Sequence, residues 1–248
     1  MKTISTLKTS FAMLIALSTI VGCSETSRIE ATGKGTIRGI NSIVTAPQLT
    51  FKIEEVPVGN AGYKQAAGFA PYDDLSYNFN FDLLLPGAAD ATRVASQFVE
   101  VIADTEYTIV LGGTIAAPTI TMWEEAEREW ADGATAYEAD FVHLSPALGE
   151  VDVYFVPFGS VPVQGEAIGT FNYGDRVPYQ EFPEGSRELF ITLKDDPGNF
   201  LYRSPTISST PATRVTYAIF DPDPTITASI AVNLIGASGE SNNIPDSR

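Results

Sequence analysis

Residues 49–53 read Leu-Thr-Phe-Lys-Ile, and residues 151–155 read Val-Asp-Val-Tyr-Phe. In both stretches apolar side chains recur at every second position, so one face of an extended chain is apolar. This alternation is typical of a strand that turns one face toward a core. A proline-containing turn precedes each stretch, at 46–47 and at 146–147. The two stretches therefore predict equivalent strands in two copies of one structural unit.

Further pairs of similar segments follow in the same order in both halves of the chain. They are 72–77 with 173–179, 105–111 with 213–219, and 118–122 with 224–230. Each copy consists of short runs rich in Val, Ile, Thr, Tyr and Phe, separated by Gly, Pro, Asn and Asp, which is typical of an antiparallel sandwich. We therefore predict an all-β fold of two tandem Ig-like antiparallel β-sandwiches, at 36–122 and 138–235.

The second copy resembles a known family at one motif. His143-Leu144-Ser145-Pro146, followed after four residues by Val151-Asp152-Val153-Tyr154, is similar to the H-A-S-P, four residues, V-D-V-Y signature of exported bacterial Ig-like domains catalogued as a domain of unknown function. The resemblance implies an Ig-like fold and export, and it implies no activity. The first copy departs from the motif, since Asn41, Ile43 and Thr50 stand where His143, Ser145 and Asp152 do.

The segment 123–137 is predicted to be a short helical linker. Glu124 and Arg128 have the i, i+4 spacing of a supporting pair, and Asp132-Gly133 would end the helix. Trp123 and Trp130 would lie on one face of this helix, where they dock onto the sandwiches or, alternatively, form an aromatic platform for a sugar. The tail 236–248 lacks large apolar groups over most of its length and is predicted to be disordered.

The beginning of the chain has the order of an export signal. Lys2 and Lys8 make the first residues basic, and the apolar run 11–17 follows them. This run is too short to span a bilayer. Residues 20–23, Ile-Val-Gly-Cys, resemble the lipobox of bacterial lipoproteins, which implies cleavage of a signal peptide at 1–22 and lipidation of Cys23. Residues 23–35 would then be a lipidated tether. Ser24 follows the cysteine, and by resemblance to enterobacterial lipoproteins this implies the outer membrane, on its periplasmic face or at the cell surface.

Composition limits the partners of the folded part. The chain has 31 acidic and 15 basic side chains, a formal net charge of −16, which disfavours nucleic acid. Cys23 is its only cysteine, so no intrachain disulfide stabilises the sandwiches. The expected partners are the membrane, through the lipid anchor, and an envelope protein or polysaccharide.

No catalytic residue is predicted. His143 and Ser145 stand two positions apart on an expected strand, too far for a direct side-chain hydrogen bond, and we interpret both as partners of backbone groups. One histidine and one cysteine are too few for common zinc sites. Paired carboxylates remain an open alternative, namely a hydrolase at the domain junction.

A candidate cation site follows from counting strands. If the second copy is antiparallel throughout, its acidic turns gather at one end. Asp195, Asp196, Asp221 and Asp223 would then supply oxygen ligands for calcium, the one cofactor that we consider. The alternative is that these aspartates are ordinary turn residues.

The sequence as a whole predicts a non-enzymatic lipoprotein, anchored in the outer membrane, that presents Ig-like domains for binding. Its candidate surfaces are the acidic end and the loop 157–164, whose apolar residues either meet a partner or pack against the linker or the first domain. The alternatives are a structural spacer and, third, the carboxylate-based hydrolase.

Overall fold

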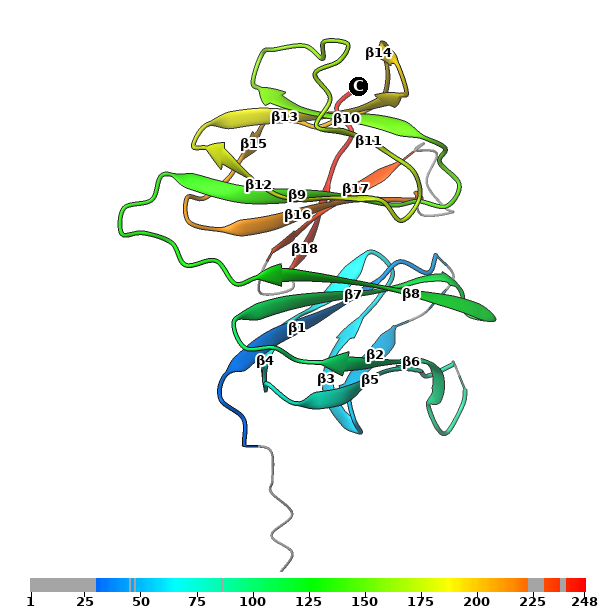
Figure 1. Ribbon diagram of the computed structural model, residues 1–248. Coiled ribbons are helices and arrows are strands. Elements are labelled where there is room, and N and C mark those ends of the chain that lie inside the picture. Colours follow the sequence, from blue (N-terminus) through cyan, green and yellow to red (C-terminus); the bar gives the residue numbers. More distant parts are fainter. Residues whose placement is uncertain (1–29, 45, 47, 86, 223–229, 237–239) are drawn as a thin grey trace, which may run out of the picture. The chain divides into compact units, whose positions relative to one another are not determined.

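A computed structural model describes residues 30–248, except 45, 47, 86, 223–229 and 237–239. The chain divides into residues 1–30 and a compact unit, Ala31–Arg248, to which everything below refers. The described residues are all-β, and their sheets form sandwich-like layers (Figure 1). A search of them for a helix of the length and apolarity needed to cross a bilayer finds none.

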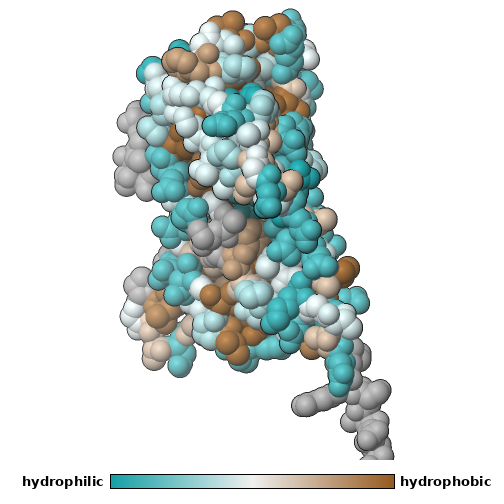
Figure 2. All heavy atoms as spheres, turned by 90° about the vertical axis from the view of Figure 1, so that its left-hand side faces the viewer, coloured by the Kyte–Doolittle hydropathy of each residue, from teal (hydrophilic) through white to brown (hydrophobic). Residues whose placement is uncertain are grey.

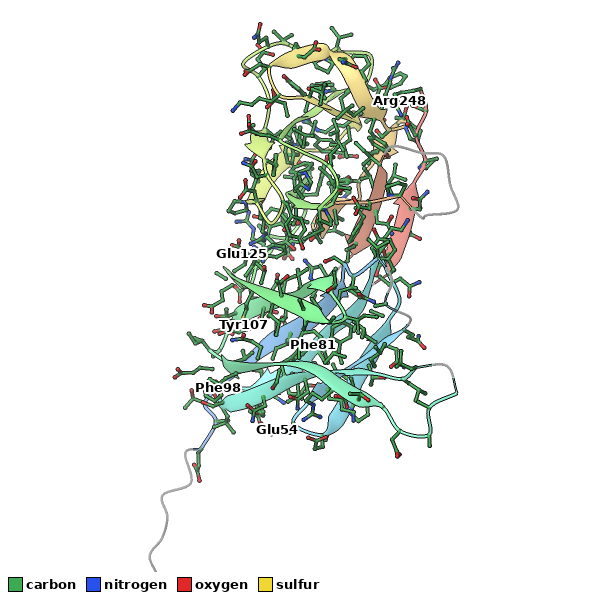
Figure 3. The ribbon with its side chains drawn as sticks, turned by 90° about the vertical axis from the view of Figure 1, so that its right-hand side faces the viewer. Glu54, Phe81, Phe98, Tyr107, Glu125 and Arg248 are labelled. Atoms are coloured by element: carbon green, nitrogen blue, oxygen red, sulfur yellow. The ribbon has the colours of Figure 1, made fainter. Side chains whose placement is uncertain are left out.

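Sandwich 1 consists of two four-stranded sheets. One has the order β4 (Gln65–Asp73), β1 (Lys34–Asn41), β7 (Thr105–Thr114), β8 (Ala117–Ala126), and the other has the order β3 (Val56–Ala61), β2 (Leu49–Ile53), β5 (Ser76–Leu83), β6 (Thr92–Glu100). Phe51, Phe79 and Phe81 pack between them, with the Phe81 ring edge-on to the other two. Phe81 is buried, whereas Phe98 is exposed (Figure 3). The alternation at 49–53 thus has the predicted cause, a strand with one face in a core.

Sandwich 2 repeats this arrangement. One sheet has the order β12 (Arg176–Pro183), β9 (Ala136–Leu144), β16 (Arg214–Phe220), β17 (Ala231–Gly236), β18 (Ser241–Ile244), and the other has the order β11 (Gly169–Phe171), β10 (Val151–Pro157), β13 (Ser186–Leu193), β14 (Asp196–Arg203), with β15 (Ile207–Ser208) also pairing with β13. The first four strands of each sheet match those of sandwich 1 in order, and the predicted pairs 49–53 with 151–155 and 105–111 with 213–219 are equivalent strands. The predicted pair 72–77 with 173–179 is wrong, because 72–77 spans the turn from β4 into β5 whereas 173–179 spans the turn into β12, the counterpart of β4. Residues 224–229 of the last predicted pair lie outside the described residues.

The prediction that the second copy is antiparallel throughout is wrong. β9 pairs in parallel with β16, and β1 pairs in parallel with β7. In each copy the first strand lies between an antiparallel and a parallel neighbour. Side-chain alternation is the same for both kinds of pairing, so the sequence pattern cannot distinguish them.

The two sandwiches share a packed junction. Its apolar part comprises Ile40, Ala66 and Val110 from sandwich 1 and Val142, Leu144, Ala218, Phe220, Ala231 and Ile235 from sandwich 2, with Tyr63 and Trp123 partly buried beside them. The sheets β4-β1-β7-β8 and β12-β9-β16-β17-β18, here called the inner sheets, therefore have both faces covered. For this reason β9 is buried at nearly every position instead of at alternate ones.

The helical linker is a wrong prediction. Residues 123–126 belong to β8, which pairs with β7 as far as Ala126, and residues 127–135 are irregular. The sequence predicted a pair between Arg128 and Glu124. Arg128 instead forms ion pairs with Glu138, at 3.5 Å, and with Glu181, at 2.8 Å. A helix of two turns has little stability of its own, and a ladder of hydrogen bonds to β7 replaces it. Sandwich 1 thus ends at Ala126, and sandwich 2 begins at Ala136.

The prediction of a disordered tail is also wrong. Residues 241–244 form β18 on the edge of β17, while 237–239 lie outside the described residues. The Tyr202 hydroxyl donates to the Ile244 carbonyl at 3.0 Å, and the Ser247 amide donates to Arg203 at 2.8 Å. Backbone pairing to an open sheet edge orders a segment that has few apolar side chains.

Candidate functional site

Equivalent β-bulges aim charged side chains into the junction. Arg38 and Asp140 stand three residues before Asn41 and His143, and each is opposed by two residues of the neighbouring strand, β4 or β12. Both are 1% exposed. Bulges commonly re-aim a side chain in this way. The repeat thus places a cation on one inner sheet and an anion at the matching position of the other.

Arg38 binds across the junction through hydroxyl groups. Its Nε donates to Thr108 Oγ1 at 2.9 Å in sandwich 1, and its Nη2 donates to Thr216 Oγ1 at 2.7 Å in sandwich 2. The Tyr179 hydroxyl is a third, longer contact at 3.4 Å, and the Phe69 ring lies 4.6 Å from the guanidinium carbon. Burial raises the pKa of Tyr179, so this hydroxyl stays neutral at physiological pH.

Arg176 forms the second bridge. It donates from Nε to Asp140 Oδ2 and from Nη1 to Glu125 Oε1, both at 2.7 Å, and so joins the two sandwiches. Its guanidinium carbon lies 5.3 Å from the centre of the Trp123 ring. Trp123 therefore docks at the junction, one of the two roles predicted for it, although it does so from a strand. Glu125, labelled in Figure 3, lies on the side of sandwich 1 that faces sandwich 2.

Arg214 forms the third bridge, at the rim. Its Nη1 contacts Glu106 Oε2 at 3.0 Å across the junction, and its Nε contacts Glu138 Oε2 at 2.6 Å. Burial raises the pKa of Glu106, and the positive charge of Arg214 opposes that rise only in part. The hydrolase alternative expected a deep cleft lined by such carboxyl groups. Glu106 and Glu138 are instead both held by one arginine.

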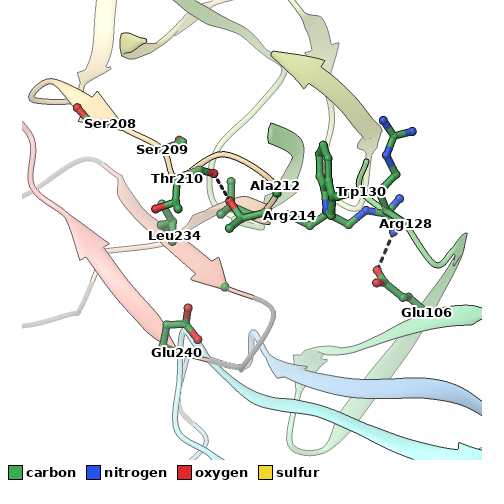
Figure 4. A pocket seen from close by; sticks show the side chains of 13 residues that line it. Glu106, Arg128, Trp130, Ser208, Ser209, Thr210, Ala212, Arg214, Leu234 and Glu240 are labelled. Carbon is green, nitrogen blue, oxygen red and sulfur yellow. Dashed lines mark hydrogen bonds and ion pairs between the residues drawn. The ribbon is translucent and has the colours of Figure 1, made fainter. Parts of the chain in front are cut away.

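A groove of about 530 Å³ opens beside this bridge. Its lining comes from the connecting segment, the turn before β16 and the end of β17: Glu106, Arg128, Trp130, Ser208, Ser209, Thr210, Ala212, Thr213, Arg214, Val215, Leu234, Gly236 and Glu240 (Figure 4). Trp130 is half-buried, with Arg128 lying 4.9 Å from its ring centre. The groove thus combines an aromatic side chain, hydroxyl groups and arginines already paired with acids.

This chemistry suits a neutral, hydroxyl-rich ligand. An indole ring offers a large amphipathic contact surface at small conformational cost. The hydroxyl groups of the lining donate and accept hydrogen bonds, and its carboxylates accept them, so both can pair with the hydroxyl groups of a ligand. The acids in the lining and the net charge of −16 disfavour an anionic ligand.

His143 is a partner of backbone groups and holds a turn, as the sequence predicted. The Ser145 amide donates to His143 Nδ1 at 3.2 Å, which leaves Nε2 to donate to the Gly149 carbonyl at 3.2 Å. Burial lowers the pKa of His143, consistent with a neutral ring that uses one nitrogen as acceptor. The prediction for Ser145 is wrong, because its hydroxyl donates to the Asp221 carboxylate and not to a backbone group.

Asn41 performs the same task in the first copy. Its Oδ1 accepts the Ile43 amide at 3.0 Å, and its Nδ2 donates to the Ala61 carbonyl at 3.2 Å. Asn41 and His143 therefore each accept the amide two residues on. Each also donates to a carbonyl, but these are not equivalent, since Ala61 ends β3 and Gly149 lies in the turn before β10. The motif has a structural role in both copies.

Three of the four aspartates of the calcium hypothesis, Asp195, Asp196 and Asp221, belong to the described residues. Asp195 and Asp196 occupy the turn into β14, where the Asp195 amide donates to Asp152 Oδ2 at 2.8 Å. Asp221 is engaged with Ser145 and the Ala147 amide, and Asp223 lies outside the described residues. Among the residues that the structure describes, no three His, Cys, Asp or Glu side chains are grouped to hold a metal.

The loop after β10 is exposed. Phe158 is 61%, Val161 69% and Val163 47% exposed. The alternative in which these residues pack against the linker or sandwich 1 is therefore wrong. Figure 2 shows hydrophobic atoms on the surface of this end of sandwich 2.

Cys23 and the signal segment 1–22 lie outside the described residues, as does the tether up to residue 29. The last residues of the tether are held, since Asp74 accepts the Thr32 amide at 2.7 Å and the Gly33 amide at 3.1 Å. Thr32 and Gly33 together keep the pKa of Asp74 low.

Sequence reasoning missed the three bridging arginines. Residues 36–41 read Thr-Ile-Arg-Gly-Ile-Asn, which is no continuous apolar run, so the sequence carries no signal that Arg38 is buried. Arg176 and Arg214 carry no signal either, because their acids come from distant segments.

Comparison with known proteins gives one family match, over less than half of the chain, and no activity. No curated protein matches the chain. The matched segment begins at the start of β1, crosses the junction and ends within β10, so it includes His143 and Asn41 but only two strands of sandwich 2. Residues 35–154 match the model of a family described as a domain of unknown function (DUF4397).

Proposed function

We propose that this protein is a non-enzymatic lipoprotein of the outer membrane whose Ig-like sandwiches bind a polysaccharide of the cell envelope. The observation that carries the binding function is the groove, with Trp130 at the rim of a packed junction. The resemblance of residues 20–23 to a lipobox carries the location. The membrane partner is reached through the lipid on Cys23.

The packed junction supports binding by a rigid site. Arg38, Arg176 and Arg214 each bind groups on both sandwiches. A groove whose walls do not have to be ordered on binding loses less conformational entropy when the ligand enters. The carboxylates Glu106 and Glu138 contribute to this rigidity, which supports a binding role for the rim over hydrolysis.

Tryptophan fluorescence tests the groove. The full chain in detergent is titrated with neutral oligosaccharides, glucan and N-acetylhexosamine oligomers, and with uronic acid oligomers of equal length. We expect a neutral series to change the emission and the acidic series to bind at least about 10-fold more weakly, a difference of about 1.4 kcal/mol.

Trp130→Ala is expected to lower the affinity at least about 10-fold. Phe98→Ala is the matched control, because Phe98 is an exposed aromatic residue on β6 that does not line the groove. Equal affinities in the two variants, or no response to any oligosaccharide, would refute the groove as the binding site.

Acylation and exposure are tested separately. Metabolic labelling with palmitate is expected to mark the wild type and to miss Cys23→Ala. Protease added to intact cells then distinguishes the cell surface from the periplasmic face. Labelling of Cys23→Ala at the wild-type level would refute the anchor.

A structural spacer is the second candidate, and the continuous junction is the observation that favours it. A spacer needs two sandwiches held rigidly and no ligand. Cells carrying Trp130→Ala would then behave as wild type, while a variant that loosens the junction would not.

A further inference from the structure

One end of sandwich 1 receives the chain from the tether. Thr32 and Gly33 are held there by Asp74, in the turn between β4 and β5. The Asp104 amide, in the loop between β6 and β7, donates to the Lys34 carbonyl at 2.9 Å. The start of the compact unit, this turn and this loop therefore meet at one end of sandwich 1, here called the entry end.

Three large apolar side chains are exposed at the entry end. Phe98, near the end of β6, is 59% exposed, and Ile102, in the loop after β6, is 56% exposed. Phe98 stands opposite Asn78 in the sheet, and the Asn78 carbonyl accepts the Glu54 amide at 2.8 Å. Glu54 lies in the turn that leads to Val56, which is 67% exposed. Figure 3 shows Phe98 and Glu54 on the side of sandwich 1 that faces away from sandwich 2.

The length of the tether limits how far the entry end can be from a lipid on Cys23. Seven residue steps separate Cys23 from Glu30. An extended chain covers at most about 3.6 Å in each step, so the two residues lie within about 25 Å of each other. A short link gives the bilayer a high effective concentration at the entry end, so that even a weak contact is populated. Exposed apolar side chains at a surface held so close to a bilayer gain free energy by entering its interface.

Acidic groups at the entry end determine which bilayer it fits. Glu54, Asp74, Glu100 and Asp104 form no ion pair within the described part of the chain. Their charge opposes an anionic headgroup layer at separations up to about 8 Å at physiological salt. A zwitterionic headgroup carries no net charge and does not repel them in this way.

We propose that the entry end rests on a zwitterionic lipid surface, with Val56, Phe98 and Ile102 in its headgroup interface. The inference rests on the proposed lipid anchor at Cys23 and adds an orientation to it. Sandwich 1 contacts the membrane, and sandwich 2, beyond the junction, does not.

Quenching of tryptophan emission by brominated lipid tests this contact. Chain 23–248, which contains the whole compact unit, is coupled through the thiol of Cys23, its only cysteine, to a maleimide lipid in phosphatidylcholine vesicles. Phe98→Trp adds a tryptophan at the entry end, and Phe158→Trp, at a similarly exposed phenylalanine of sandwich 2, is the matched control. Brominated phosphatidylcholine should remove most of the emission that Phe98→Trp adds to the wild type. It should leave the emission that Phe158→Trp adds.

The lipid composition tests the role of charge. Replacing part of the phosphatidylcholine by anionic phosphatidylglycerol should reduce the quenching of Phe98→Trp at low salt, and added salt should restore it. Equal fractional quenching of the two added tryptophans, or quenching of neither, overturns the proposal, as does quenching that increases with phosphatidylglycerol. The coupling is chemical, so this result does not depend on whether cells acylate Cys23, which palmitate labelling decides.

Discussion

Phe220→Ala tests whether the junction stabilises the molecule as one unit. Phe220 is 0% exposed at the end of β16, and its ring meets Tyr63 of sandwich 1 edge-on, with 5.9 Å between centres. Truncating a fully buried phenylalanine to alanine costs about 3–5 kcal/mol, which includes the ring pair. For a unit of this size, about 4 kcal/mol corresponds to a fall in melting temperature of roughly 8–16 °C.

The assay is urea unfolding followed by two signals. Tryptophan emission reports on the junction through Trp123, and far-UV circular dichroism reports on the strands. In the wild type the two transitions should coincide, because the inner sheets cover each other. In Phe220→Ala the emission change should come first, because the junction opens before the strands melt.

Phe81→Ala is the matched control. Phe81 is equally buried, but it lies in the core of sandwich 1, away from the junction. It should cost a similar free energy and keep the two signals together, at least until sandwich 1 unfolds. A loss below about 1 kcal/mol in Phe220→Ala would refute the reasoning, since so small a cost means that the site is not packed.

Three further outcomes are expected. His143→Ala leaves the Ser145 amide and the Gly149 carbonyl unpaired, so it should lower the free energy of unfolding in urea by about 2–4 kcal/mol. His143→Asn, which copies Asn41, should lower it by less than half of that amount. Equal losses in the two variants would contradict the shared role. The folded pKa of His143, the only histidine, is lowered from 6.5, so the stability that its neutral ring provides is present above pH 6.5 and is lost as pH falls through the folded pKa. The difference in unfolding free energy between wild type and His143→Asn should therefore narrow as the pH is lowered from about 7.5 to 5.5, and a flat difference would contradict the buried neutral ring. Truncation after Glu240 removes β18 and the acceptor of the buried Tyr202 hydroxyl, so it should lower stability by about 1–3 kcal/mol, while an unchanged midpoint would mean that the tail is not held.

Local sequence pattern predicted the strands well where one face meets a core. Residues 49–53 and 151–155 are strands in equivalent places, and the repeat is matched by strand order. The pattern failed at 123–126 and 241–244, where the deciding partners are β7 and β17. At both places pairing to a neighbouring edge outweighs weak local preference.

The candidate site was predictable only in fragments. Trp130 was recognised as a residue that either docks or offers an aromatic surface, but its groove contains Ser208, Thr210 and Arg214 from a turn far along the chain. The role of His143 as a partner of backbone groups followed from strand spacing, and its equivalence to Asn41 did not. An imidazole and an amide share no sequence signal, although each presents an acceptor and a donor.

By itself the sequence determined the class of the fold and its duplication, because alternation and turn residues act within a few positions along the chain. Only the tertiary structure decided the parallel pairs, the junction with its bridging arginines, and the groove. Each of these joins residues distant in sequence, and their free energy depends on burial and on the partner charge, neither of which a one-dimensional pattern contains.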